Sequence, residues 1–348
     1  MKRWTLFLSL CATALSVSLA AQTPDAEASA EPEVSTEVVE AVEAVEAVEA
    51  AADEPAATGA AGETPIDLSQ WRYQNTTLAR YNPLGLFNQL QVGYRRYLWQ
   101  PTGSRLRDGS YLALNLAPTV SPAWARIGPQ LEIQPLAILR LVAQYDWVGH
   151  FGTFDTIQSF QTANADWREA TMEANSETAS YATTGHVVTL SGTLQAAVGP
   201  IALRSELRGI YHSLDLQGED TLFYDIVFDL LAPNRAWLTT TDSDILYLDP
   251  SGDLKIGIRH TWIRANYDET NFLDTESQQE GNEATHRIGP LVTYRLNPRQ
   301  DVRFSEPTLI LIMNWWLQHP YRTGVETSQA VPYVVLGFRF NGRLDVPR

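Results

Sequence analysis

The residue types that most often carry chemistry fall into no catalytic spacing in this chain. The six histidines are His150, His186, His212, His260, His286 and His319. None stands at the spacing of a metal site or in an HExxH motif, and there is no G-x-S-x-G elbow or phosphate-binding glycine loop. The only cysteine, Cys11, lies in the apolar N-terminal run. We therefore expect no metal, no cofactor and no disulfide in the mature chain.

Charged side chains form the one chemical pattern that repeats. They recur at every second position of short runs, as in Arg204, Glu206 and Arg208. Because side chains of a β-strand alternate with a period of two, this spacing places the charges on one face. Ten bases and three acids share the pattern: Arg95, Arg126, Glu132, Arg140, Asp146, Arg204, Glu206, Arg208, Lys255, Arg259, Arg287, Arg295 and Arg339. They predict a basic surface within a chain whose formal net charge is −16.

The elements that must position these charges are short amphipathic strands. The stretch from His186 to Leu214 shows this most clearly, as two strands joined by a tight turn at Gly199-Pro200. Leu203 and Leu207 alternate with the charged residues of the second strand. In a soluble sandwich the apolar face would be buried in a core. In an outer-membrane barrel the apolar face meets lipid and the polar face lines a lumen.

Three observations favour the barrel. The polar faces carry long charged side chains. Aromatic residues gather near the strand ends: Tyr97, Trp99, Tyr145, Trp147, Tyr211, Trp262, Tyr267, Trp315 and Phe340. Such residues form girdles at membrane interfaces. Phe340 closes an apolar-alternating last strand, although eight residues follow it. From about residue 70 to 341 the pattern resembles that of bacterial outer-membrane β-barrel proteins as a class, without pointing to one family.

The strand count follows from this resemblance. Eleven alternating runs occur, over residues 87–99, 111–120, 125–134, 137–149, 186–198, 201–214, 245–248, 255–267, 286–296, 308–318 and 332–341. Bacterial single-chain barrels have an even number of strands, with long loops on one side and short turns on the other. The long segments 150–185, 215–241 and 268–284 fall on one side. A further strand within Gln70–Tyr81, before the turn at 82–85, completes an all-β, closed antiparallel barrel of twelve strands.

The N-terminal part of the chain has a different composition. Lys2 and Arg3 precede an apolar run that ends in small residues, which indicates a signal peptide over residues 1–21. Residues 22–65 are rich in Ala, Glu and Pro, with 12 acids and no base, and we expect a disordered linker there. The barrel domain is expected over 66–348, in the bacterial outer membrane. No basic patch or RNA-binding motif indicates a nucleic-acid partner.

The predicted basic face suggests a passive, porin-like channel for small solutes, with outer-membrane lipid as the surrounding partner. In this hypothesis Arg140, Arg204 and Arg208 line one constriction and favour anions. The alternative is a non-conducting structural or surface-binding barrel whose interior is filled by side chains or an inserted loop. A lipid-modifying enzyme is a third possibility. It would need a catalytic pair on the outer wall, where Ser205 and His260 are candidates that nothing in the sequence pairs. The sequence identifies neither the solute nor an oligomeric state.

Overall fold

The computed structural model describes residues 67–348, except 154–156, 275, 277–282, 297–302, 325–329 and 346–348. The predicted signal peptide (1–21) and the linker (22–65) lie outside the described residues. Within the described part of the chain, no helix is long and apolar enough to cross a membrane.

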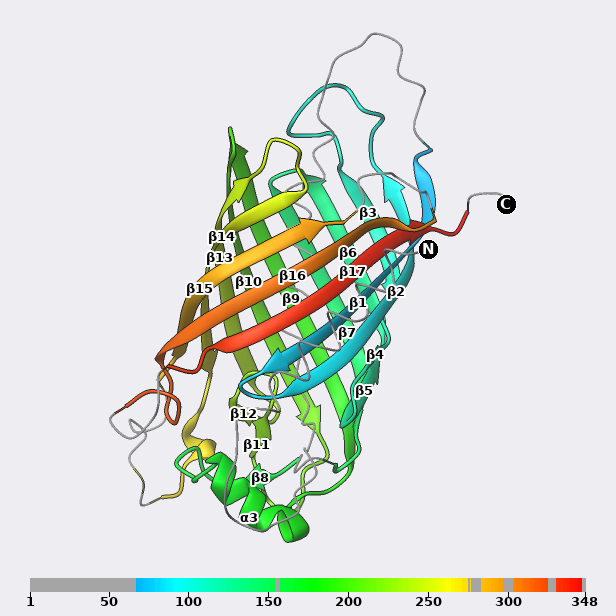
Figure 1. Ribbon diagram of the computed structural model, residues 1–348. Helices are drawn as coiled ribbons and strands as arrows, with labels where there is room; N and C mark the ends of the chain where they lie inside the picture. Colours follow the sequence, from blue (N-terminus) through cyan, green and yellow to red (C-terminus); the bar gives the residue numbers. More distant parts are fainter. Residues whose placement is uncertain are drawn as a thin grey trace, which may run out of the picture. The chain divides into compact units, whose positions relative to one another are not determined.

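The chain forms a closed antiparallel β-barrel of twelve strands, as predicted (Figure 1). In chain order the wall consists of β1 (Ser69–Tyr81), β2 (Gly85–Tyr97), β3 (Tyr111–Leu116) with β4 (Thr119–Val120), β5 (Trp124–Ile127) with β6 (Pro129–Leu136), β7 (Leu139–His150), β9 (Thr183–Val198), β10 (Ile201–Leu214), β13 (Trp237–Leu248), β14 (Leu254–Ala265), β15 (Thr285–Arg295), β16 (Ser305–Gln318) and β17 (Tyr333–Arg343). The pairs β3/β4 and β5/β6 are each one broken wall strand.

The strand predicted before residue 87 is β1, and it closes the barrel. Its residues 72–81 pair with β17 on one side, and its residues 69–80 pair with β2 on the other. An open sheet would leave two rows of unpaired backbone N–H and C=O groups, and closure removes both. The even strand number places the start of β1 and the end of β17 at the same end of the barrel.

The outer wall of the barrel is apolar, as the alternation predicts. Leu194 and Ile245 each keep 61% of their surface exposed, and Leu207 keeps 56%. In β10 every second residue is buried instead, so exposed and buried positions alternate strictly from Ile201 through Leu207. Soluble monomers rarely expose apolar area on this scale, whereas a bilayer covers it. This is the architecture of an outer-membrane barrel.

Two sequence expectations need correction. The predicted run 245–248 is only the last third of β13, which begins at Trp237. Before residue 245 its outward positions include Thr239, Thr241 and Ser243, so this part of the strand lacks the contrast between an apolar and a polar face from which strands are predicted. Tyr267, expected in an aromatic girdle, lies beyond β14 and donates from its hydroxyl to the carbonyl oxygen of Leu231 at 2.6 Å.

The predicted loop segments contain a second, smaller sheet at one end of the barrel. It has the strand order β12 (Leu230–Pro233), β11 (Leu222–Asp225) and β8 (Ser159–Phe160). Figure 1 shows this sheet and the helix α3 (Glu169–Ala179) at the end of the barrel away from the start of β1. We call the sheet, α3 and the turns beside them the cap. The sequence did not predict α3, because only Met172 of its residues is buried and the helix lacks an apolar face.

Candidate functional site

The predicted charged face is buried in the barrel. The structure buries eleven of the thirteen predicted site residues, each at most 7% exposed: Arg126, Glu132, Arg140, Asp146, Arg204, Glu206, Arg208, Lys255, Arg259, Arg287 and Arg339. Arg95 and Arg295 are half-buried. The Arg95 guanidinium stacks on the ring of Tyr111, 3.9 Å from its centroid. Arg295, the last residue of β15, pairs at 2.9 Å with Asp253 in the turn between β13 and β14, at the end of the barrel away from the cap.

Strand register joins the charges of β10, β13 and β14 into one cluster. Arg204 stands opposite Asp244, and Asp244 stands opposite Arg259 on the next strand. Arg204 Nη1 donates to Asp244 Oδ2 at 2.8 Å. Arg259 binds the same carboxylate through two hydrogen bonds of 2.7 Å, from Nε and Nη2. Because both arginines are buried, this two-sided pairing compensates for the loss of their hydration.

Two residues earlier in β13, a second carboxylate also pairs with an arginine. Asp242 accepts from Arg208 Nη2 at 2.6 Å and from the Thr261 hydroxyl at 2.6 Å. Glu206 lies beside it and is hydrogen-bonded to Arg204. Three arginines and three carboxylates therefore form a balanced cluster on this wall.

A separate polar group lies on the wall formed by β3, β5, β6 and β7. Arg140 Nε donates to Glu132 at 2.5 Å, and the Tyr111 hydroxyl donates to the same carboxylate. Arg126 and Asp146 are 3.6 Å apart. Of the three arginines predicted to share a constriction, Arg140 thus belongs to a different cluster from Arg204 and Arg208.

Sequence reasoning missed Asp242 and Asp244, and this changes the predicted charge of the interior. On the described wall strands, nine buried Lys or Arg side chains face five buried Asp or Glu side chains. The prediction counted ten bases against three acids. The surplus of positive charge is therefore smaller than the sequence suggested. The signal that could have found them is the even spacing of Leu238, Asp242, Asp244 and Leu246, which places all four on one face of β13.

The hairpin β11–β12 crosses the mouth of the barrel. The chain leaves the wall after β10 and rejoins it at β13. The tip of the hairpin contacts β1, which lies opposite β10 in the strand order of the barrel. There Arg80 donates to the carbonyl oxygens of Ile226 and Val227, each at 3.3 Å. Both faces of the hairpin are buried. Phe223 and Phe228 pack on wall residues such as Ile210, whereas Leu222 and Tyr224 pack beneath Trp167 and α3.

Asp229 fixes the hairpin tip from the other side. Its carboxylate pairs with Arg322, lies 3.3 Å from His319 Nε2, and accepts from the Tyr224 hydroxyl at 2.8 Å. Burial alone would raise the pKa of Asp229, but the charges of Arg322 and His319 outweigh it and hold that pKa well below its usual range. The hairpin is therefore anchored by an ionised carboxylate.

The outer wall carries a row of polar residues that includes Ser205 and His260. Ser205 Oγ lies 3.0 Å from Ser243 Oγ, and His260 Nε2 lies 3.3 Å from His286 Nδ1. Ser243 stands opposite His260 in the register, but no Ser–His hydrogen bond joins the two pairs in the described chain. The lipid-modifying alternative thus lacks the contact that it requires there. No group of three or more potential metal ligands occurs among the described residues.

No protein-family model matches the chain, and no curated protein sequence matches it. Among solved structures, Omp33 of Acinetobacter baumannii is similar at 10% identity and a TM-score of 0.34, covering 80% of this chain and 100% of that one. The NanC porin has 10% identity and a TM-score of 0.34, with 78% and 100% covered. The β-domain of the Bordetella autotransporter BrkA has 12% identity and a TM-score of 0.37, with 79% and 99% covered. These similarities are too low to carry a functional inference.

Proposed function

We propose that this protein is a porin-like outer-membrane channel for small solutes. In this proposal the thirteen residues predicted from the sequence, together with Asp242 and Asp244, line the passage. The cap hairpin narrows its outer mouth. The observation that supports the proposal is the composition of the inner face of the barrel, where the wall strands carry fourteen buried Lys, Arg, Asp and Glu side chains instead of an apolar core.

The charge of the passage determines the selectivity that we expect. With nine buried bases and five buried acids on the wall strands, the residual charge is positive. Low-dielectric walls focus even a small field on a permeating ion. We therefore expect a mild preference for anions, weaker than the sequence alone suggested.

A planar bilayer tests this proposal. The wild-type protein should conduct in small steps, and its reversal potential in a salt gradient should lie moderately toward the anion limit. A variant in which a short Gly-Ser linker replaces residues 222–233 should conduct in larger steps. Arg204→Glu with Arg208→Glu should shift the reversal potential toward cations. A wild-type reversal potential at the cation limit would contradict the proposed selectivity.

The second candidate is a closed barrel that acts through its outer surface. It is favoured by the hydrophobic packing on both faces of the hairpin, which leaves Leu222, Phe223 and Leu231 at most 2% exposed. If neither the wild type nor the shortened variant conducts, the closed barrel is the correct description. If only the shortened variant conducts, the hairpin is a complete seal in the resting protein.

A further inference from the structure

The inner face of the barrel carries more positive than negative charge. On the wall strands nine buried Lys or Arg side chains face five buried Asp or Glu side chains. Two further bases, Arg72 and Arg95, are half-buried on the same strand faces as the buried Thr76 and Gln91. Excess charge of one sign between low-dielectric walls attracts groups of the opposite sign. The interior therefore offers a docking surface for a polyanion.

This chain carries a polyanion of its own. Residues 22–65, which lie outside the described residues, contain twelve acids and no base. From Glu40 to Glu49 a glutamate stands at every third position, and only Ala and Val stand between the glutamates. These ten residues therefore combine four carboxylates with side chains small enough for the interior of a twelve-stranded barrel.

The root of this acidic segment lies at the mouth of the barrel away from the cap. β1 starts at that mouth, and just before it the carbonyl oxygen of Leu68 accepts a hydrogen bond from the Tyr97 N–H at 2.8 Å. In the register of β1 with β2, Gln70 stands opposite Arg95. The chain thus joins the wall beside a base that faces inward.

The length of chain between the glutamates and this root is sufficient to reach the interior. Glu49 precedes Asp67 by eighteen residues, a length that spans at most about 60 Å when fully extended. A wall strand of twelve residues such as β7, at about 3.3 Å per residue and a tilt near 40°, spans about 30 Å along the barrel axis. The four glutamates can therefore reach the middle of the lumen while Asp67 stays at the rim.

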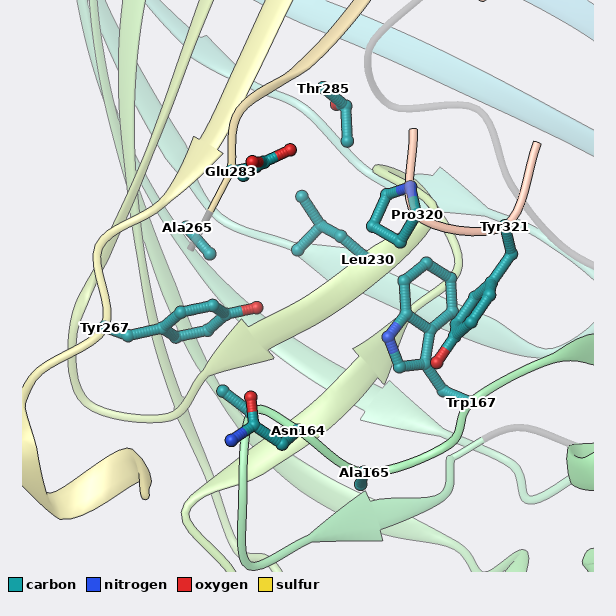
Figure 2. Close-up of a pocket in the computed structure, with 11 residues that line it drawn as sticks. Asn164, Ala165, Trp167, Leu230, Ala265, Tyr267, Glu283, Thr285, Pro320 and Tyr321 are labelled. Carbon is teal, nitrogen blue, oxygen red and sulfur yellow. The ribbon is translucent and has the colours of Figure 1, made fainter. Parts of the chain in front are cut away.

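The cap occupies the opposite mouth. Its hairpin is buried on both faces, and Figure 2 shows Leu230 of the hairpin between Tyr267 on one side and Trp167 with Tyr321 on the other. The Trp167 and Tyr321 rings meet edge to face, with centroids 4.6 Å apart. A segment that enters from the end of β1 is therefore stopped by packed side chains at the far end of the lumen.

We propose that residues 40–49 dock in the lumen from the end away from the cap and supply negative charge to its bases. Once one glutamate has bound, the others act at an effective concentration set by the tether, so the segment competes with freely diffusing anions. Docking does not require a conducting barrel. Its effect on current, in contrast, rests on the proposed function, because the docked segment narrows the passage.

Thiol labelling of the full chain in detergent tests the docking. The only cysteine of the sequence is Cys11, so Ala44→Cys gives the chain from residue 22 on a single thiol. A maleimide on a long polyethylene glycol should label this thiol about tenfold or more slowly in the folded protein than in urea, because the reagent reaches it only after release. In 1 M salt, where the Debye length is about 3 Å, the protection should be lost. Equal rates in the folded and unfolded protein at low salt would overturn the proposal.

Two sets of linker substitutions separate charge from sequence in the labelling assay. One set replaces four glutamates with glutamine and the other replaces the same four with aspartate, at Glu40, Glu43, Glu46 and Glu49. The glutamine set should label at nearly the unfolded rate, whereas the aspartate set keeps the charge and should stay protected. Neither set changes a residue of the barrel wall, so loss of the fold does not explain a difference. Protection that survives in the glutamine set would show that charge does not hold the segment.

A matched pair of wall variants locates the docking surface. Arg72→Gln with Arg95→Gln should speed labelling about two- to fivefold, the range expected for partly exposed ion pairs. Arg264→Gln is the control, because Arg264 is exposed on the outward face of β14 at its cap end, and the labelling rate should not change. An equal effect of both variants would place the segment outside the lumen.

Planar-bilayer currents distinguish this inference from the proposed function. If the barrel conducts, the glutamine set should open in larger steps than the wild type and the aspartate set in wild-type steps. Protected thiols in a barrel that never conducts would support the docking and contradict the channel. Conduction with unprotected thiols would support the channel and overturn the docking.

Discussion

At the residue scale, the interior of this barrel depends on buried carboxylates that pair with arginines. Asp244 pairs with two of them, since it binds Arg204 and Arg259 through three hydrogen bonds of 2.7–2.8 Å. Buried charges are tolerated only when they are paired and hydrogen-bonded. The stability of the wall therefore depends on a few acids rather than on the more numerous arginines.

Replacing Asp244 with asparagine should destabilise the barrel strongly. The change removes one charge from a cluster of buried guanidiniums, and we expect a loss of roughly 3 kcal/mol in the free energy of unfolding. Asp253→Asn is the matched control. Its pair with Arg295 is about one quarter exposed, so a loss below about 1 kcal/mol is expected. Urea unfolding in detergent, followed by tryptophan fluorescence, compares the two. Similar losses would show that the buried cluster has no special role.

The lowered pKa of Asp229 predicts how the stability of the cap changes in acid. Its pKa is lower in the folded protein than in an unfolded chain, so the unfolded state binds more protons as the pH falls. The stabilisation is complete above the ordinary aspartate pKa of about 4 and is lost as the pH drops through the lowered folded value. A spin label at position 227 should therefore be immobile at neutral pH and become mobile only in strong acid. In Asp229→Asn the label should be mobile at every pH, and an acid transition that survives there would contradict this assignment.

At the element scale, the hairpin β11–β12 behaves as a piece separate from the wall. It pairs with β8 but with no wall strand, and it is held by side-chain packing and by contacts at its tip. The wall strands, in contrast, are each hydrogen-bonded on both sides. The cap should therefore open locally at a lower free energy than the barrel.

Phe228→Ala tests this separation. Phe228 is 2% exposed and packs against the wall beneath the hairpin, so its truncation should lower the opening free energy of the cap by about 3 kcal/mol. Hydrogen exchange should then accelerate over residues 222–233 and stay slow in β10 and β13. Phe304→Ala, at a position that is 44% exposed, is the control and should leave hydrogen exchange unchanged in both the hairpin and the wall strands. Acceleration in the wall as well would show that cap and barrel form one cooperative unit.

At the scale of the whole molecule, the barrel depends on one long-range pairing. β1 and β17 meet in the register Ala79↔Leu336, between residues that are 257 positions apart in sequence. All other neighbouring wall strands are closer in the chain. The closing seam is therefore the last contact that a growing sheet can make.

A designed disulfide tests the register of the seam. In Ala79→Cys with Leu336→Cys, the two thiols lie on the same outward face and directly opposite each other, within disulfide reach. Oxidation should cross-link the variant and preserve the compact form on heating in detergent. Ala79→Cys with Phe338→Cys places the thiols diagonally, at about 7 Å or more between Cα atoms, and should not cross-link. Efficient cross-linking of the diagonal pair would indicate a shifted register.

The sequence alone determined the strands, their two faces and their number. Side-chain alternation is a local property with a period of two, so Leu203, Arg204 and their neighbours reveal the two faces without any knowledge of the fold. Eleven of the thirteen predicted interior residues are buried for that reason. The requirement for an even number of strands then predicted β1, although its outward positions include Tyr73, Asn75 and Thr77 and are therefore only weakly apolar.

Only the tertiary structure decided which charges meet and what covers the mouth. Asp242 and Asp244 become partners of Arg208 and Arg204 through the register of β10 with β13, and register depends on the turns and closure of the whole barrel. The hairpin residues 222–233 look like part of a long loop, because a segment buried on both faces has no alternation to recognise. Its anchor on β1 joins residues more than 140 positions apart, and such a contact exists only once the barrel has closed.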